Sequence, residues 1–205
     1  MRSLPPFARP LDAMDAALPK PDVVRICKHI GLRLARPADA AFILSLRLNQ
    51  DRNKYLSPVA DDVAAQARWL EQYVEREAAG LERYYIILDK DDRDIGTIRL
   101  YDFRGDSFCQ GSWVVVPDAP NYQAIETTVS IYEIGMGQMG FKRTHFEVKH
   151  VNERVIAFNV FFGARKTTSN EEFQQFEMTL EEYLAVRKRY VRFLVNRGDE
   201  GWTQG

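Results

Sequence analysis

The chain has 205 residues, of which 45% are hydrophobic and 12% aromatic, and its formal net charge at pH 7 is −1. This size fits one globular domain. The near-zero net charge is unlike that of nucleic-acid-binding proteins, which usually carry a surplus of basic residues. No apolar run reaches the ~20 residues of a membrane span. The two cysteines, Cys27 and Cys109, are far apart and fit no metal or redox spacing, so we expect a cytoplasmic protein without nucleic-acid, membrane or metal partners.

The N-terminal segment is rich in proline, and the folded domain is expected to begin after it. Residues 1–22 contain several prolines and no apolar signal core. We therefore predict a flexible arm over residues 1–22, one domain over residues 23–197 and a disordered tail over residues 198–205.

Apolar periodicity, helix caps and turn residues predict the elements of the domain. In chain order these are strand 30–36, a helix from Pro37 to Leu48, a helix from Asp61 to Gly80, strands 84–88, 95–101 and 111–117, helix 124–134, strand 144–150, helix 152–162, strand 172–178 and helix 183–195. The acidic residues 89–94 suit a hairpin turn, and residues 103–110 are expected to form a second turn region. This order predicts an α/β (α+β) fold with a mixed, mostly antiparallel sheet and one parallel crossover.

The helix over residues 124–134 begins just beyond the C-terminal end of the strand over residues 111–117. Free N–H groups and the positive end of the helix dipole meet at such a place. Because this combination binds anions, we expect a phosphate-bearing ligand beside it.

The segment Gly135–Gly140 matches the dinucleotide fingerprint G-x-G-x-x-G. That motif needs a strand before it and a helix after it, whereas here a predicted helix precedes it and a predicted strand follows. We interpret these glycines as a helix end and a turn. Residues 127–134 also have a composition that a strand tolerates, so the alternative stays open.

The basic stretch Arg187–Arg189, with Arg192 and Arg197, lies on the last predicted helix. Cations are favourable near a helix C-terminus, and we interpret this stretch as a solvated helix face rather than a nucleic-acid site.

Three segments in this order resemble the GNAT superfamily of acetyl-CoA-dependent N-acetyltransferases. Residues 95–101 are similar to the third strand of that family, Gly111–Pro117 to its bulged fourth strand, and Asn152–Arg165 to its N-x-x-(S/A)…G-F helix. The resemblance covers residues 30–192. It is closest to RimJ/RimL-like enzymes that modify amino-sugars of surface polysaccharides. It implies a GNAT-type sheet flanked by helices with a splayed central strand pair.

The resemblance implies acetyl-CoA as acetyl donor and no metal. In the family, backbone groups of the splayed fourth strand hold the pantetheine arm; here these are the groups of Trp113, Val114, Val115 and Val116. Asn152 matches a residue that lies beside pantetheine in the family. The alternatives are a plain buried strand for the first set and a simple N-cap for Asn152.

The pyrophosphate loop of the family, Q/R-x-x-G-x-G/A, falls on Ala119–Ala124. Only Ala124 satisfies the pattern, and Tyr122 replaces the first glycine, where a side chain would crowd the phosphates unless its ring points away. Pro120 removes one donor. We expect Asn121, Tyr122, Gln123 and Ala124 still to bind the cofactor through their N–H groups, with reduced affinity.

Candidates for the general base lie on the strand over residues 144–150. His145 and Glu147 share one face of it, opposite Phe146. His145 titrates near neutrality, and Glu147 would serve if burial raised its pKa; a solvated polar face is the alternative. The position of a family tyrosine that protonates the leaving thiolate falls on Asn159, whose amide cannot act as that acid, so water does so or CoA leaves as thiolate.

Acceptor recognition is expected from the loop after the first helix. Arg47, Arg52, Asn53 and Tyr55 offer cations and an aromatic ring, which suit a diphosphate and a base; an ordinary surface loop is the alternative. The favoured acceptor is the primary amine of a nucleotide-linked amino-sugar. A protein N-terminus, a polyamine, an antibiotic and a non-catalytic GNAT-like binding module are the alternatives. The oligomeric state, with a homodimer among the options, stays open.

Overall fold

The computed structural model describes residues 23–49, 55 and 58–196. The predicted arm and tail, and the acceptor candidates Arg52 and Asn53, lie outside these residues. The elements are β1 (Gly31–Leu34), η1 (Pro37–Asp39), α1 (Ala40–Leu48), α3 (Val63–Ala78), β2 (Arg83–Leu88), β3 (Asp94–Arg104), β4 (Ser107–Val115), α4 (Gln123–Tyr132), η2 (Glu133–Gln138), β5 (Arg143–Lys149), α5 (Glu153–Phe162), β6 (Arg165–Ser169), β7 (Phe173–Thr179), α6 (Leu180–Arg187) and η3 (Val191–Phe193).

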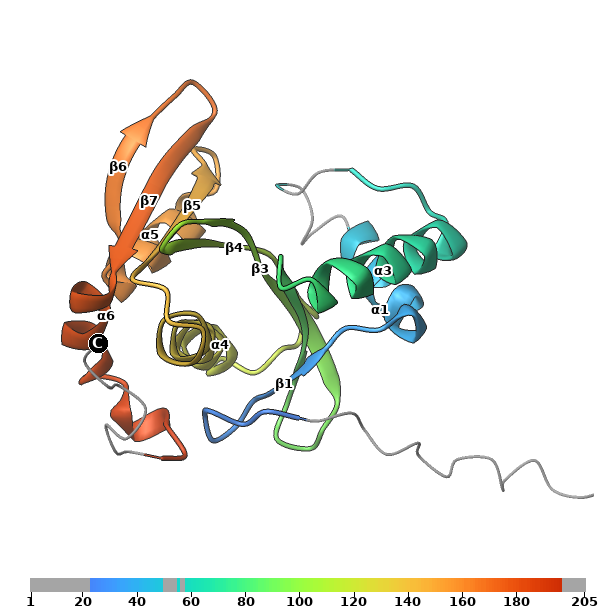
Figure 1. Ribbon diagram of the computed structural model, residues 1–205, viewed down its shortest axis with the longest axis horizontal. Coiled ribbons are helices and arrows are strands. Elements are labelled where there is room, and N and C mark those ends of the chain that lie inside the picture. Colours follow the sequence, from blue (N-terminus) through green and yellow to red (C-terminus); the bar gives the residue numbers. More distant parts are fainter. Residues whose placement is uncertain (1–22, 50–54, 56–57, 197–205) are drawn as a thin grey trace, which may run out of the picture.

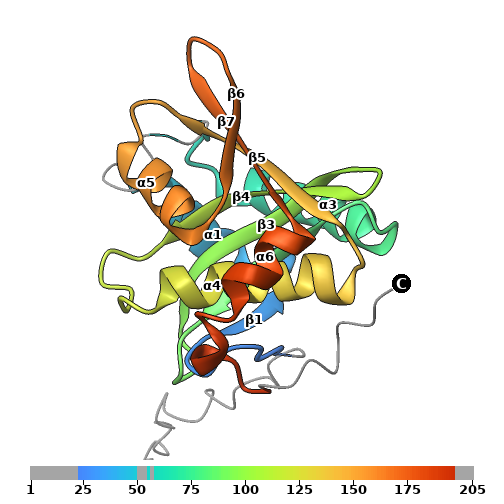
Figure 2. The same ribbon diagram turned by 90° about the vertical axis from the view of Figure 1, so that its left-hand side faces the viewer.

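The seven strands form one sheet in the order β1-β2-β3-β4-β5-β7-β6. Every neighbouring pair is antiparallel except β4 and β5, which are parallel. The predicted fold class, a mixed and mostly antiparallel sheet with flanking helices and one parallel crossover, is confirmed. Figure 1 places α1 and α3 on one face of the sheet and α4 on the other, and Figure 2 shows α4 and α6 together in front of it.

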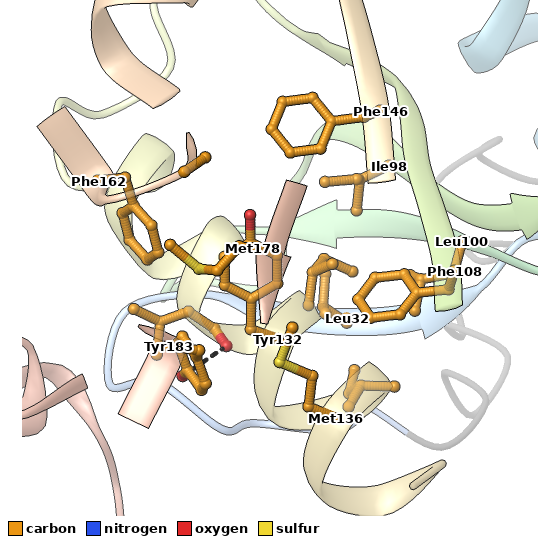
Figure 3. Packing of buried hydrophobic residues seen from close by; sticks show 14 of the residues in the cluster. Leu32, Ile98, Leu100, Phe108, Tyr132, Met136, Phe146, Phe162, Met178 and Tyr183 are labelled. Atoms are coloured by element: carbon orange, nitrogen blue, oxygen red, sulfur yellow. Dashed lines mark hydrogen bonds between the residues drawn. The ribbon is translucent and has the colours of Figure 1, made fainter. Parts of the chain in front are cut away.

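A large apolar core surrounds α4. The Tyr132 ring of this helix lies 6.5 Å from Phe108 of β4, 5.5 Å from Phe162 of α5 and 5.1 Å from Tyr183 of α6, measured between ring centroids. Figure 3 shows Tyr132 amid these side chains. Because all four rings are buried, their packing ties α4 to the sheet and to both C-terminal helices, and so fixes the position of the N-terminus of α4.

Three sequence predictions of secondary structure were wrong in detail. The expected turn region 103–110 is mostly strand, because β3 runs to Arg104 and a tight turn at Gly105, with φ of +58°, starts β4 at Ser107. β6 was missed, because its five residues are all exposed and lack apolar alternation. The last helix ends at Arg187 instead of continuing to residue 195.

The glycine-rich segment does not form a dinucleotide-binding turn. α4 continues without a break into η2, a π-helical stretch that contains Gly135, and a strand follows. A Cβ atom at Gly135 would lie 2.5 Å from the Phe108 ring, so the glycine is required for close helix–strand packing. Gly140, with φ of +80°, makes the turn into β5.

The solvated-face interpretation of the basic stretch is wrong for Arg187. This residue is 6% exposed, and its Nε donates to Oε1 of Glu133 at 2.6 Å. Tyr183 Oη donates to the same oxygen at 2.6 Å. Arg187 therefore belongs to a buried polar cluster between α6 and η2, whereas Lys188 and Arg189 are exposed.

Both cysteine thiols are buried in the core and unpaired with each other. Burial raises the pKa of Cys27 to about 12 and that of Cys109 to about 11, from an ordinary value of 9.0. The folded chain thus keeps two protons that the unfolded chain loses first, so the free energy of unfolding is expected to fall as pH rises from 9.0 through these values. Denaturant melts at increasing alkaline pH would measure the fall; a flat profile would contradict it.

Within the described part of the chain, no helix combines the length and the apolar character that crossing a bilayer would require.

Candidate active site

β4 and β5 separate after a short paired stretch and leave a cleft between them. Their parallel pairing joins only Ser107–Cys109 to Arg143–His145, although both strands continue for several residues. A cleft of about 180 Å³ lies in the gap, with α5 along one wall. Its lining residues are Tyr55, Ile98, Gln110, Gly111, Trp113, Phe146, Glu147, Val148, Lys149, Asn152, Val155, Asn159 and Phe173.

The β4 side of the cleft carries a bulge. Ser112 has φ of +50°, and the register with β3 shifts between Thr97 and Arg99, which turns the strand away from β5. In the described residues, no strand pairs with the edge of β4 that faces β5 beyond Cys109, so this edge offers backbone groups to a ligand. The Nε1 atom of Trp113 is buried without a hydrogen-bond partner in the described part of the chain.

The four residues predicted to hold pantetheine, of which Val116 lies just beyond the end of β4, differ in their surroundings. Trp113 lines the cleft, and its ring lies 5.9 Å from that of Phe158 on α5. The Val114 side chain is buried in the core, as the plain-strand alternative requires. The N–H of Val116 already donates to the carbonyl of Ile95 at 2.9 Å and is not available to a ligand.

The N-terminus of α4 follows β4 after a short loop. The Pro120 carbonyl accepts from the N–H of Gln123 at 3.0 Å, and Tyr122 has φ of −71° and ψ of −19°, so residues 120–123 form a type I turn. Gln123 is therefore not a free donor. The N–H groups of Asn121, Tyr122 and Ala124 donate to no other described residue, and no side chain caps the helix. Unpaired N–H groups at a helix N-terminus fit a diphosphate.

The Tyr122 ring lies against the N-terminal segment of the domain. Its centroid is 4.9 Å from that of His29, and burial, followed by the charges of Asp89 and Glu126, raises the pKa of Tyr122. Because His29 also bonds to Glu126 in the first turn of α4, the ring lies against the side of the helix that carries Glu126.

The structure separates the two candidate bases on β5. Glu147 lines the cleft, and its Oε2 accepts from Nε2 of Gln175 at 2.7 Å. His145 does not line the cleft; its Nδ1 lies 2.6 Å from Oγ of Ser107 and its Nε2 lies 3.4 Å from Oδ2 of Asp102, at the closed end where β4 and β5 still pair. Glu147 is exposed, so the burial on which its prediction as a base depended is not found, and the solvated-face alternative fits its surroundings. Of the two residues, Glu147 is the one that lies where it can meet a substrate.

Two asparagines of α5 face the cleft. Asn152 is the N-cap residue of α5, but its side chain makes no capping hydrogen bond, so its amide is free to meet a ligand. Asn159 is 4% exposed, and its Nδ2 donates to the Val155 carbonyl at 2.8 Å. An amide has no acidic proton, so the statement that Asn159 is not the acid rests on its residue type and stays a prediction.

Among the acceptor candidates, the structure describes Arg47 and Tyr55. Tyr55 lines the cleft. Arg47 lies in the last turn of α1 and is partly buried. Arg52 and Asn53 lie outside the described residues.

The cleft is also lined by Gln110, Lys149 and Phe173, none of which was predicted to be a site residue. Lys149 pairs with Glu172 at 2.8 Å, and its Nζ lies 5.6 Å from the centre of the Phe173 ring. The alternation along β5 that puts Glu147 on one face puts Lys149 on the same face, which is the signal that could have found it. Gln110 was hidden by its assignment to a turn. In the described residues, no group of three or more His, Cys, Asp or Glu could hold a metal ion.

Comparisons with known proteins agree with this architecture. The model of the acetyltransferase (GNAT) domain family matches residues 29–163. A solved structure described as apo FdhC, a nucleotide-linked sugar GNAT, is 37% identical, with 85% of this chain and 99% of that chain covered and a TM-score of 0.78. The search of curated proteins found no match.

More distant solved structures share the fold. A dodecameric spermidine N-acetyltransferase from Vibrio cholerae is 14% identical, with 76% of this chain and 96% of that chain covered and a TM-score of 0.62. A ribosomal-protein-S5-alanine acetyltransferase from Vibrio fischeri is 15% identical, with 79% and 98% covered and a TM-score of 0.64. At these identities the likeness concerns the fold alone.

Proposed function

The chain belongs to the GNAT acetyltransferase family, and we propose that it transfers the acetyl group of acetyl-CoA to the primary amine of a nucleotide-linked amino-sugar. The chain is an acyltransferase, as the resemblance implied. The observation that carries the donor part of this proposal is the cleft between the diverging strands β4 and β5, which has unpaired N–H groups of the α4 N-terminus beyond the end of β4.

The residues around the cleft fit acetyl-CoA. The N–H groups of Asn121, Tyr122 and Ala124 would hold the diphosphate. The unpaired edge of β4 and the free amide of Asn152 would hold the pantetheine arm. Bound there, acetyl-CoA supplies an acetyl group activated as a thioester.

Three roles fall to the chain in the transfer. Glu147 accepts a proton from the acceptor's ammonium, which leaves a neutral nitrogen to attack the acetyl carbon. Backbone N–H groups on the open edge of β4 stabilise the negative charge that develops on the carbonyl oxygen, an effect worth ~3–4 kcal/mol in other acyl-transfer enzymes. As the new carbon–nitrogen bond forms and the carbon–sulfur bond breaks, the attacking nitrogen gives up its second proton to water. The sulfur leaves as thiolate or takes that proton through water, because Asn159 carries no acidic proton.

Charged and aromatic side chains at the cleft support the acceptor proposal. Tyr55 and Phe173 offer flat apolar surfaces for a sugar or a base. Lys149 offers a cation for a diphosphate. Its ion pair with Glu172 lies at the surface, so breaking that pair to bind a diphosphate would cost little free energy. FdhC is described as acting on a nucleotide-linked sugar, which agrees with this acceptor class. RimJ/RimL-like membership, a cytoplasmic location, a domain over residues 23–197 and a homodimer stay predictions.

Turnover with a panel of amines tests the proposal. Thiol release from acetyl-CoA would be followed with nucleotide-linked amino-sugars, the free amino-sugars, spermidine and a peptide with a free N-terminus. We expect kcat/KM to be highest for a nucleotide-linked amino-sugar. A higher value for spermidine or the peptide would contradict the acceptor, and no binding of acetyl-CoA would contradict the donor.

Asn121→Pro tests the diphosphate loop. Proline is favoured at the second position of a type I turn, which Asn121 occupies, so the loop is expected to keep its shape while one unpaired N–H is removed. Leaving a ligand oxygen without its donor costs ~1–3 kcal/mol, so the Kd for CoA should rise about tenfold or more. Isothermal titration would measure it. Asn121→Ala, which keeps the N–H, must have the smaller effect; equal effects would mean that the backbone donor is not used.

A further inference from the structure

We propose that His29 and Glu126 form a clamp that holds the Tyr122 ring off the diphosphate-binding end of α4 and so replaces the glycine of the family's pyrophosphate loop. This inference rests on the proposed function. It assigns a positioning role to residues outside the cleft and outside the loop itself.

Glu126 anchors the clamp. Its side chain is fully buried in the first turn of α4, and its only partners in the described residues come from one short segment. The backbone N–H groups of His29 and Ile30 donate to Oε2 at 2.8 and 3.2 Å, and Nδ1 of His29 lies 2.5 Å from Oε1. A buried carboxylate with so few donors holds them strongly, because losing any one leaves a charge unsatisfied. The segment before β1 is thereby fixed to the α4 N-terminus.

His29 carries the restraint to Tyr122. The imidazole, fixed through Nδ1, presents its ring to the Tyr122 ring at a centroid distance of 4.9 Å and an angle of 39°. Tyr122 and Glu126 are four residues apart and so share one face of the helix. Tyr122 is therefore held on the flank that faces His29, while the unpaired N–H groups point along the helix axis past its end.

Backbone conformation shows why a ring clamp is sufficient. Tyr122 has φ of −71° and ψ of −19°, which any L-residue adopts without strain. The backbone conformation at this position therefore does not require the glycine of the family pattern. The remaining requirement is that the Tyr122 side chain stays out of the space that the phosphates would occupy. The clamp clears that space.

A double-mutant cycle on CoA affinity tests the clamp. Without the histidine ring, Tyr122 is free to swing across the loop, so His29→Ala should raise the Kd for CoA about tenfold in the Tyr122 background. In the Tyr122→Gly background there is no ring to restrain, and His29→Ala should change the Kd less than about twofold. Isothermal titration of the four proteins gives both factors, and Lys28→Ala, which removes an exposed cation beside His29, should change the Kd less than about twofold.

Each other outcome overturns the clamp. Equal factors in the two backgrounds would mean that His29 acts without Tyr122, and no effect in the Tyr122 background would mean that the ring needs no restraint. If His29→Ala does not fold, His29→Asn keeps a donor for Glu126 but lacks the ring, and it must show the same dependence on Tyr122. Binding of CoA by the unaltered protein without coupling overturns the clamp alone, whereas no binding at all overturns the proposed function with it.

Discussion

Glu147→Gln is expected to lower kcat by about 10²–10⁴, the usual range for loss of a general base. The amide keeps the size of the side chain and the acceptor that Gln175 uses at 2.7 Å, so the cleft should keep its shape. It cannot take a proton from the acceptor's ammonium. Steady-state kinetics would show the fall in kcat, while the Kd for acetyl-CoA should change less than about threefold, because the donor is held elsewhere.

His145→Gln is the matched control for this prediction. The two positions lie on the same face of β5, two residues apart, but His145 bonds to Ser107 and Asp102 at the closed end of the strand pair. Its replacement should lower kcat by less than about tenfold, through small shifts of β5. A larger loss of kcat for His145→Gln than for Glu147→Gln would indicate that His145, and not Glu147, is the general base.

The sequence predicted the frame of the site because its signals are local. The N-cap of α6 and the left-handed Gly163 at the end of α5, with φ of +116°, depend on residues within one turn of each other. The β2–β3 hairpin depends on two strands that are neighbours in the chain. The splayed pair was accessible only by family resemblance, because the divergence of β4 from β5 depends on pairing between residues that are distant in the chain.

The parts of the site that escaped prediction are set by tertiary contacts. His29 and Glu126 are 97 residues apart in the chain, and neither has a local pattern that marks it. From the sequence, Tyr122 in place of the loop glycine predicted weaker cofactor binding. The direction of the Tyr122 ring could not be predicted, because it depends on the distant contact with His29. Likewise, His145 lies outside the cleft because it bonds to Ser107 and Asp102, near the β3–β4 turn. The alternation of residues along β5 gives no information about these bonds.

Arg187→Ala is expected to lower the free energy of unfolding by about 3–5 kcal/mol, because it leaves the Glu133 carboxylate buried without its cation. The Arg187 guanidinium contacts both oxygens of Glu133, through Nε at 2.6 Å and through Nη2 at 3.3 Å, and the two side chains are 7% and 13% exposed. For a chain of this size such a loss corresponds to a fall in Tm on the order of 10 °C. Calorimetric or denaturant melts would measure it.

Two further variants separate the buried pair from the basic character of this stretch. Lys188→Ala removes an exposed neighbouring cation and should change the free energy of unfolding by less than about 0.5 kcal/mol.

The double variant Arg187→Met with Glu133→Gln removes both charges, fills the volume and keeps an acceptor for Tyr183. It should recover most of the lost free energy of unfolding, because the cost lies in the unpaired charge and not in the missing bond. Equal losses in the free energy of unfolding for Arg187→Ala and Lys188→Ala would show that the net charge of this stretch, and not the burial of Arg187, determines its contribution to stability. A double variant as unstable as Arg187→Ala would show that the guanidinium stabilises the α6–η2 contact mainly by packing.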